Sequence, residues 1–373
     1  RNQLVNMKVV YICSTLEPSG PVNQLYQIVR NMDPHSFKSH IITLSSNPKN
    51  SRVQDFQRTG VETHSLHLSR VASAVLGVTK LKSKLDEIQP DILHSHGFRA
   101  DIINTLTPIN AYKVNTIHSY YYNHHPNKYG RILGSGLAWA HLYSIKQLDT
   151  AVACSNAVAS DVAQHGISTC VIPNGVDIER FEPVSQDKTI NSRSEIGLPS
   201  EPDIFLSVGS LTERKDPLTL IKGFSKWSKK DSRLVILSGG PLLKQCREMA
   251  ADDPKVIVRG PVPTVDPYLK AADYFVSASQ SEGLPMAVLE AISSGLPVCL
   301  SRIAPHEEIL EYDPNAGTTF DVGSPKSVAR SLENLSSASY RKQSQAARGI
   351  AENHLSATKM SSSYQELYCT SQK

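Results

Sequence analysis

Short apolar runs alternate with longer amphipathic segments along almost the whole of the 373-residue chain. The apolar runs are rich in Val, Ile and Leu, which is typical of buried parallel strands. They predict strands at 7–13, 38–45, 61–67, 91–95, 113–118, 149–154 and 169–172, and then at 203–209, 233–239, 255–259, 273–278, 297–301 and 317–321. Between them, helical spacing of apolar positions predicts helices at 21–32, 73–88, 127–147, 216–229, 241–252 and 284–294. This alternation favours an α/β protein with parallel sheets covered by helices on both faces.

The strands fall into a group of seven and a group of six, which favours two doubly wound domains over a single eightfold barrel. Turn-forming and polar residues fill the chain between the groups, from Pro173 to Pro202. We therefore expect a first domain at 1–180, a linker at 181–200 and a second domain at 201–355.

Composition and cysteine spacing are those of an ordinary globular protein, with 40% hydrophobic and 20% charged residues. The longest weakly polar stretch, 132–145, is too short to span a bilayer. Residues 1–6 precede a run that fits a buried strand better than a signal peptide, and we leave open whether they are native. The six cysteines lack C-x-x-C spacing, so we expect reduced thiols, with Cys13, Cys154 and Cys170 as small core residues.

The net positive charge of the chain comes entirely from its first half. Residues 1–185 hold 17 Lys and Arg against 13 Asp and Glu, whereas residues 186–373 hold 22 of each. This bias fits contact with an anionic partner such as a phospholipid surface or a lipid pyrophosphate, and it fits a chance surplus equally well. No basic and aromatic stripe or known motif points to nucleic acid.

A pair of glutamates eight residues apart is the most informative chemical feature. The segment 281–291 reads SEGLPMAVLEA and is followed by a Gly-Leu-Pro stop at 295–297. This punctuation predicts a helix with Glu282 at its N-terminal mouth and Glu290 two turns inside it. Backbone N–H groups at such a mouth suit a phosphate, and carboxylates suit sugar hydroxyls. Taken alone, two glutamates at this spacing would also fit a capped surface helix.

Two adjacent cations follow the first strand of the second domain. Arg214 and Lys215 stand between a small-residue turn and a predicted helix, which is a phosphate-binding arrangement, although a solvated loop would show the same pair. Polar residues also end two strands of the first domain, namely His94 and His96 after the fourth and His118 after the fifth. Side chains at the carboxyl ends of parallel strands face ligands, although a histidine there is often structural.

Together these motifs resemble retaining nucleotide-sugar glycosyltransferases of the GT-B architecture, specifically glycosyltransferase family four (group 1). The resemblance covers nearly the whole chain and implies two Rossmann-like domains facing across a cleft. It also implies that a C-terminal helix within 356–373 crosses back to the first domain. Arg214 takes the place of an arginine that the family has directly after Gly209, where this chain has Ser210.

The family pattern implies a role for each matching residue. The catalytic group is Lys215, Arg214, Glu282 and His118, in which the cations stabilise the leaving diphosphate, Glu282 holds the transferred sugar and His118 contacts the donor sugar or the acceptor. The donor-binding group is Gly20 in a phosphate-covering loop, Ser210, Glu290 on the ribose, the helix mouth Gly283, Leu284 and Pro285, and Val262 near the base. Acceptor contacts are expected from His96 and from the aromatic pair Tyr120 and Tyr121.

The expected reaction moves a hexose or N-acetylhexosamine from a UDP- or GDP-sugar to a saccharide acceptor. A lipid-linked acceptor in bacterial surface polysaccharide synthesis is expected, such as O-antigen, capsule or lipopolysaccharide. No cofactor and no metal are expected, and the sequence contains no Asp-x-Asp motif. We expect a cytoplasmic protein, with peripheral contact to the inner face of the membrane. Two alternatives remain open here, a sugar-nucleotide epimerase of the same architecture and a non-catalytic sugar-binding subunit. Sequence leaves the base, sugar, linkage, acceptor and oligomeric state open.

Overall fold

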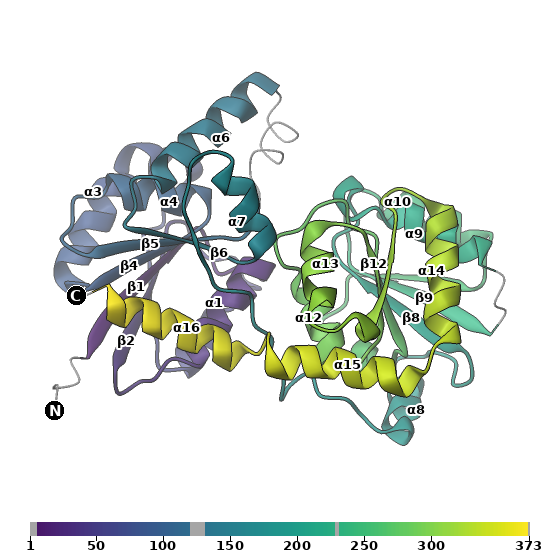
Figure 1. Ribbon diagram of the computed structural model, residues 1–373. Helices are drawn as coiled ribbons and strands as arrows, with labels where there is room; N and C mark the ends of the chain where they lie inside the picture. The colour runs from purple at the N-terminus through teal and green to yellow at the C-terminus, as the bar shows by residue number, and fades with distance from the viewer. Residues whose placement is uncertain (1–5, 120–130, 228–230, 372–373) are drawn as a thin grey trace. The chain divides into compact units, whose positions relative to one another are not determined.

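The computed structural model describes residues 6–119, 131–227 and 231–371 of the chain. It contains two compact units, one built from Arg1–Asn174 together with Ala357–Lys373 and the other from Gly175–Ser356. We call these unit 1 and unit 2. Figure 1 shows that each unit consists of a central sheet with helices packed around it.

Unit 1 contains a seven-stranded, fully parallel sheet in the order β3-β2-β1-β4-β5-β6-β7. Its strands are β1 (Met7–Cys13), β2 (Phe37–Thr43), β3 (Glu62–Ser65), β4 (Ile92–His96), β5 (Tyr112–Ile117), β6 (Thr150–Ala153) and β7 (Cys170–Val171). Its helices are α1 (Gly20–Arg30), α2 (Val53–Arg58), α3 (Arg70–Ile88), α4 (Phe98–Leu106), α6 (Arg131–Ile145), α7 (Asn156–Ala163) and α16 (Ala357–Thr370). Along the chain, strands are first added from β1 toward β3 and then from β4 toward β7. The order in which strands are added therefore reverses between β1 and β4.

Unit 2 repeats this plan with a six-stranded parallel sheet in the order β10-β9-β8-β11-β12-β13. Its strands are β8 (Asp203–Val208), β9 (Ser232–Leu237), β10 (Val256–Gly260), β11 (Tyr274–Ser277), β12 (Val298–Ser301) and β13 (Gly317–Phe320). Its helices are α8 (Gln186–Glu195), α9 (Pro217–Lys226), α10 (Leu243–Ala251), α11 (Asp266–Ala271), α12 (Met286–Ser293), α13 (Ala304–Glu311), α14 (Pro325–Ser337) and α15 (Tyr340–Asn353), with short 3-10 turns η1 (Glu213–Lys215) and η2 (Pro314–Ala316). Here the direction reverses between β8 and β11.

The first strand shows why the apolar runs become central strands. Alternate residues of a strand point to opposite faces of a sheet. Val9 and Tyr11 of β1 belong to one buried cluster, while Val10 and Ile12 belong to another. Because both faces are covered, β1 has no polar face, and its sequence is a continuous apolar run. The predicted α/β class with two doubly wound sheets is confirmed.

The C-terminal helix α16 packs on unit 1, as the resemblance implied. Tyr364 and Tyr368 are fully buried in the cluster that also contains Tyr11. Ser361 on the same helix donates a hydrogen bond of 2.8 Å to the carbonyl of Ile28 in α1. Burial of two tyrosines explains why this polar segment folds onto a distant part of the chain.

The segment between the two sheets differs from the expected linker at 181–200. It belongs to unit 2, which begins at Gly175, and it contains helix α8. Arg193 of α8 is 5% exposed and donates to the carbonyls of Ala271 and Ser200 at 2.9 and 2.7 Å. Its charge is paired with Asp273, the residue before β11. The contacts of this buried arginine thus hold the segment against unit 2, although its polar composition is that of a solvated loop.

Two smaller expectations are met only in part. Cys170 is exposed because it lies on the two-residue edge strand β7, so its assignment to the core is wrong, whereas Cys13 and Cys154 are buried. Of the helix expected at 127–147, residues 131–145 form α6, and 127–130 lie outside the described residues. In the part of the chain that the structure describes, no helix combines the length and apolarity needed to cross a bilayer.

Candidate functional site

Each unit has one place where its fold favours ligand binding. In open parallel sheets, ligands bind beyond the carboxyl ends of the strands where the strand order reverses. In unit 1 this point lies between β1 and β4, whose last residues, Cys13 and His96, are paired in register. In unit 2 it lies between β8 and β11, so the loops 209–216 and 278–285 flank it. Of the expected site residues, Arg214, Lys215 and Glu282 lie in the two loops of unit 2, and His96 ends β4 in unit 1.

Arg214, Lys215 and Glu282 form one charged cluster in unit 2. Arg214 donates from Nη1 to Oε2 of Glu282 at 2.9 Å and also to the carbonyl of Ser281. Lys215 donates from Nζ to Oε1 of the same carboxylate. The backbone joins the two loops as well, because Gln280 N–H donates to the carbonyl of Arg214 at 2.7 Å. The structure therefore brings together the two cations and the first glutamate of the predicted motif.

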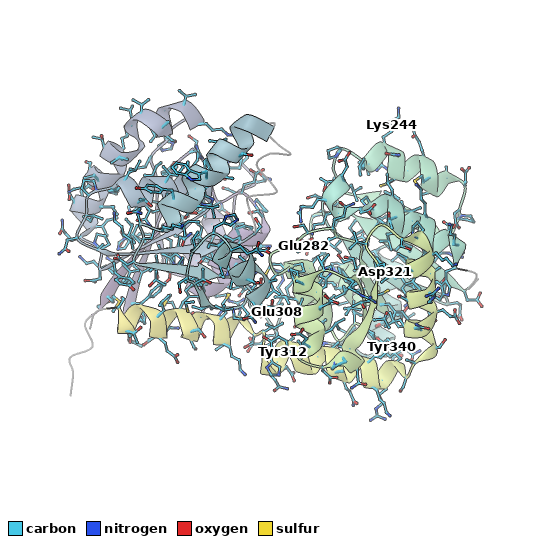
Figure 2. The ribbon with its side chains drawn as sticks, turned by 45° about the horizontal axis from the view of Figure 1, so that its top comes forward. Lys244, Glu282, Glu308, Tyr312, Asp321 and Tyr340 are labelled. Carbon is cyan, nitrogen blue, oxygen red and sulfur yellow. The ribbon has the colours of Figure 1, made fainter. Side chains whose placement is uncertain are left out.

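The charge state of Glu282 follows from these contacts. Its side chain is 9% exposed, and burial by itself would raise the pKa of the carboxyl group. The neighbouring charges of Lys215 and Arg214 outweigh that effect and lower its pKa to about 2. The cluster thus carries one negative and two positive charges at neutral pH. Figure 2 shows Glu282 in unit 2, on the side of the unit where Glu308 of α13 also lies.

Helix α12 begins directly after this cluster. Its N-cap is Pro285, whose side chain makes no capping hydrogen bond. Gly283, Leu284 and Pro285, which precede the helix, are buried. The positive dipole end of a helix is suited to an anion, as the sequence indicated.

Glu290 lies inside α12 and is half-buried. The charge of Glu290 acts on Arg180. The pKa of Arg180 is raised mainly by its hydrogen bond to Asp266 and further by the charge of Glu290. Arg180 makes a two-pronged contact with Asp266 at 2.7 Å for each nitrogen. The two predicted glutamates therefore have different cationic neighbours, which the E-x7-E spacing did not reveal.

Ser210 and Val262 have less defined surroundings. Ser210 is exposed in the loop after β8, and Val262 is half-buried in the loop between β10 and α11. The donor roles expected for both residues stay predictions.

Sequence reasoning missed the glycine pair that supports the loop carrying the cations. Leu211 N–H donates to the carbonyl of Gly239 at 2.8 Å, and the carbonyl of Leu211 accepts from Leu242 N–H at 3.0 Å. A Cβ on Gly240 would come within 2.7 Å of the amide nitrogen of Leu211, at a φ of +153°. Only glycine fits this approach of two backbones. The Gly-Gly-Pro run at 239–241 was the available signal.

His306 is a further histidine with a specific place in unit 2. Its ring is fully buried in α13, and Nδ1 lies 2.9 Å from the carbonyl of Ser301. A carbonyl can only accept, so Nδ1 carries the proton and Nε2 presents a lone pair. Burial lowers the pKa of His306 to about 4, although the backbone contact with Ser301 and the charge of Glu282 act in the opposite direction. Within the described structure Nε2 has no hydrogen-bond partner.

The histidines of unit 1 form a buried network below its switch point. His94 contacts the hydroxyl of Tyr368 through Nδ1 at 2.6 Å and that of Thr116 through Nε2 at 2.8 Å. His96 contacts His118 between Nδ1 and Nε2 at 2.9 Å, and these two rings stack. Burial lowers the pKa of His94 and His118 to about 3 and that of His96 well below its usual range, so all three are neutral at pH 7.

A cavity of about 230 Å³ opens above this network. Its lining includes His96 and Gly97 from the end of β4 and polar residues of the loop after β1, namely Ser14, Thr15, Glu17 and Ser19. His96 Nε2 is buried and has no hydrogen-bond partner in the described structure. Gly20 begins α1 immediately after Ser19, and its Cα faces open space. The structure thus places His96 at the cavity wall.

His118 contacts His96, and its Nε2 atom is the one that makes this contact. Its predicted catalytic role stays a prediction. Tyr120 and Tyr121, the predicted aromatic acceptor contacts, lie outside the described residues.

Comparisons with known proteins place the chain in a family. Residues 18–180 match the family described as Glycosyltransferase Family 4, and residues 202–338 match Glycosyl transferases group 1. The chain belongs to glycosyltransferase family 4. The predicted family is therefore confirmed, and the two matches fall on the two units separately.

Relatives within this family differ in how much of their length the chain covers. The O-antigen biosynthesis glycosyltransferase WclY of Escherichia coli is 24% identical over 97% of this chain and 98% of its own. An E. coli α-1,3-galactosyltransferase that uses UDP-Gal and α-D-GlcNAc-diphosphoundecaprenol is 26% identical over 57% of this chain. The teichuronic acid biosynthesis glycosyltransferase TuaC of Bacillus subtilis is 29% identical over 63% of this chain. The chain spans 58% of the length of each of the latter two proteins.

Solved structures show the same architecture. Anabaena Alr3699/HepE in complex with UDP superposes with a TM-score of 0.81 at 14% identity, covering 98% of this chain and 100% of that one. Sucrose-phosphate synthase from Thermosynechococcus elongatus gives 0.82 at 14% identity, covering 98% of both chains. These likenesses show the GT-B fold of two Rossmann-like domains.

Proposed function

We propose that this family 4 protein is a retaining glycosyltransferase that moves a hexose or N-acetylhexosamine from a UDP- or GDP-sugar to a saccharide acceptor. The observation that carries the proposal is the buried Glu282 carboxylate held between Lys215 and Arg214 at the switch point of unit 2. The UDP complexes of HepE, a protein of the same fold, support a nucleotide-sugar donor.

The cationic cluster would bind the donor diphosphate. Glu282 neutralises one of the two positive charges, so Lys215 and Arg214 together leave a net charge of +1 facing an incoming anion. The N-terminus of α12 adds a positive dipole end. Fixed positive charge at the leaving group is the role that a metal ion has in other transferases, and we propose that this enzyme acts without one.

Sugar hydroxyls would be held by acceptors close to this cluster. Glu282 is ionised and is assigned to hydroxyls of the transferred sugar. His306 Nε2 offers a second, neutral acceptor, because its Nδ1 proton is committed to the Ser301 carbonyl. Glu290 is assigned to the ribose hydroxyls.

In the proposed reaction the bond between the anomeric carbon and the β-phosphate oxygen breaks while the acceptor oxygen bonds to the same face of the sugar. The acceptor proton passes to the departing phosphate oxygen, so the products are the glycoside and a nucleoside diphosphate. Lys215 and Arg214 stabilise the negative charge that grows on the diphosphate. No carboxylate nucleophile is needed.

Unit 1 would bind the acceptor. Its cavity is lined by His96 and by Ser14, Thr15 and Ser19 of the loop after β1, together with apolar residues. The names of two relatives, an O-antigen enzyme and a transferase acting on a diphosphoundecaprenol substrate, support a lipid-linked saccharide of a surface polysaccharide. The positive charge excess in residues 1–185 agrees with this acceptor and with peripheral contact to the cytoplasmic face of the membrane.

The experiment begins with a thermal-shift screen of UDP, GDP and their hexose and N-acetylhexosamine derivatives. With the nucleotide so identified, Glu290→Ala is expected to weaken binding of the free nucleoside diphosphate in calorimetry. Lys215→Ala is expected to lower turnover about a hundredfold, because it removes a cation that acts in the transition state. Lys222→Ala, on the exposed face of α9, is the matched control and should behave as wild type.

Near-wild-type turnover of Lys215→Ala would show that the phosphate assignment is wrong. Incubation of the donor without any acceptor separates the alternatives, since an epimerase would return a changed nucleotide sugar. Donor binding without turnover over any acceptor would indicate a non-catalytic subunit.

A further inference from the structure

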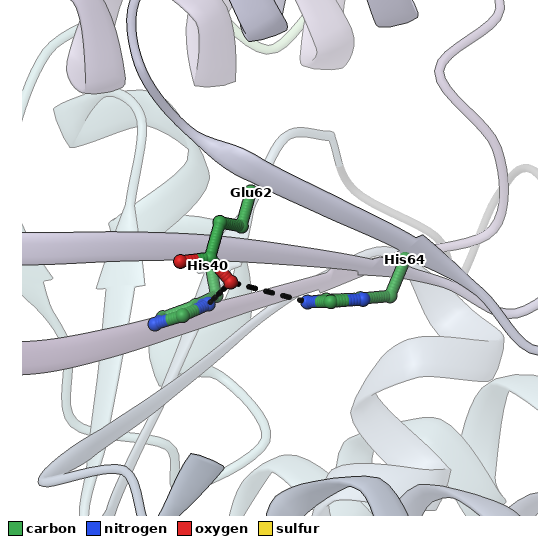
Figure 3. A group of neighbouring side chains, drawn as sticks. All are labelled: His40, Glu62 and His64. Atoms are coloured by element: carbon green, nitrogen blue, oxygen red, sulfur yellow. Dashed lines mark ion pairs between the residues drawn. The ribbon is translucent and has the colours of Figure 1, made fainter.

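A second group of chemically active side chains lies at the edge of the unit 1 sheet, apart from the switch point. Glu62 and His64 are two residues apart on the edge strand β3, so both side chains point to one face of the sheet. His40 on β2 is the register partner of Glu62 and shares that face. Figure 3 shows the Glu62 carboxylate between the two imidazole rings.

Both ring nitrogens converge on one oxygen. His40 Nδ1 lies 3.4 Å from Glu62 Oε2, and His64 Nε2 lies 3.9 Å from the same atom. The three ligand atoms all lie within 4.8 Å of one another. Tetrahedral coordination with metal–ligand bonds near 2.1 Å needs about 3.4 Å between ligand atoms. The His40–Glu62 distance already meets this. His64 would have to move roughly half an ångström closer to Glu62, and its nitrogen lies within 4.8 Å of that of His40.

The two nitrogens lack any other use. Neither His40 Nδ1 nor His64 Nε2 has a hydrogen-bond partner in the described part of the chain, although both atoms are buried. His40 as a whole is only 4% exposed. A neutral imidazole nitrogen carries a lone pair that a metal ion can accept. A carboxylate oxygen can only accept, so each of these nitrogens must either direct its ring proton toward Glu62 or share a cation with it.

The charged residues around His40, Glu62 and His64 make their ion pairs outside the space between the three ligand atoms. Lys38 contacts the other carboxylate oxygen, Oε1, at 3.0 Å, which orients Oε2 toward the histidines. Lys84 and Glu87 of α3 lie near His64 but pair with each other at 2.6 Å. The side chains of Glu62 and His64 are 51% and 28% exposed, so an ion and its water can enter from solvent.

We propose that His40, Glu62 and His64 form a binding site for a borderline divalent cation, Zn²⁺ by preference, with solvent in the fourth position. Two imidazoles and one carboxylate suit Zn²⁺ and are a poor match for Mg²⁺ or Ca²⁺, which prefer oxygen ligands. The ion links the short edge strand β3 to β2 and has a structural role. This site is independent of the proposed transferase function, and the expectation of metal-free catalysis concerns unit 2.

The test uses the full-length, untagged protein after treatment with a chelator. Zn²⁺ is titrated in competition with a chromogenic chelator, and we expect one equivalent bound to wild type. His64→Gln and Glu62→Gln should each weaken that binding at least about tenfold, because each removes one of three protein ligands. These partly exposed positions are chosen because substitution of the buried His40 risks the fold.

His35→Gln is the matched control, since His35 is exposed in the same unit and lies outside the strands. Zn²⁺ should raise the unfolding temperature of wild type and of His35→Gln, while His64→Gln should show little change. Mg²⁺ should have no such effect on any of them. The proposal fails if wild type binds no Zn²⁺ at micromolar concentration, or if the two ligand variants bind it as tightly as wild type.

Discussion

Replacing Glu282 by glutamine should remove a specific, acid-sensitive contribution to the stability of unit 2. The carboxylate is buried and held by Lys215 and Arg214, which keep it ionised far below the usual pH. Glutamine has nearly the same shape but cannot titrate. The comparison of wild type with Glu282→Gln therefore isolates the ionisation of this one group.

The magnitude follows from the folded and unfolded pKa values. A folded-state pKa of about 2, against the usual 4.5 of an unfolded glutamate, corresponds to about 3 kcal/mol of stability when the group is ionised in both states. Because the folded pKa is the lower one, this contribution is fully present above pH 4.5. It is lost progressively as the pH falls from about 4.5 toward 2.

Unit 2 can be followed by its own tryptophan. The chain has two, and Trp227 is 3% exposed in the core of unit 2, whereas Trp139 in unit 1 is 67% exposed. In a Trp139→Phe background, urea unfolding monitored by Trp227 fluorescence reports on unit 2. The difference in unfolding free energy between this background and the same protein carrying Glu282→Gln should shrink by roughly 2 kcal/mol between pH 6 and pH 3.

The matched control is Glu248→Gln, which alters an exposed carboxylate on α10 whose distance from Lys244 is 3.8 Å. It should give a stability difference that does not change with pH. If the difference for Glu282→Gln is equally constant from pH 6 to pH 3, the carboxylate is not held ionised by its two cations. The electrostatic description of the site would then be wrong.

Two further substitutions test the scaffold of the sites. Gly240→Ala should destabilise unit 2 by ~1–3 kcal/mol, because its Cβ would overlap the backbone of Leu211. Gly349→Ala, a helical glycine with open surroundings, should be neutral or stabilising by comparison; equal effects in urea unfolding would refute the close-approach argument. Tyr368→Phe should cost ~1–3 kcal/mol in unit 1, since it leaves His94 Nδ1 buried without its 2.6 Å partner. Unchanged unfolding of that variant would mean that the contact between Tyr368 and His94 does not stabilise unit 1.

The elements of this protein could be predicted from sequence because their signals are local. Each apolar run buried on both faces became a strand, as the two buried clusters on either side of β1 illustrate. The helix mouth at Pro285 was also readable, since glycine and proline act on their own backbone and that of their neighbours. The pairing of Lys215 with Glu282 was expected only in outline, from the rule that strand ends at a switch point lie together.

The α8 segment shows where local signals fail. Its composition is polar, yet Arg193 is buried by carbonyl groups and a carboxylate that come from other parts of unit 2. No property of residues 181–200 taken alone indicates those partners. The prediction of a linker followed from composition, which does not contain this information.

The same distinction separates the histidines. From sequence, His94, His96 and His118 were three similar residues at strand ends. In the structure His94 contacts Tyr368 and His118 contacts His96, while His96 also lines the cavity of unit 1. Likewise, His40 acquires its neighbours Glu62 and His64 only through the register of β2 with β3.

Sequence alone determined the strands, the helices, the doubly wound class and the motif that places this chain in family 4, because backbone preference and burial pattern are encoded over a few neighbouring residues. Tertiary structure decided which histidine nitrogens have a hydrogen-bond partner, which carboxylate stays ionised and which polar segment is buried. Those properties depend on distance and solvent access between residues far apart in the chain, and both are set only when the sheets form.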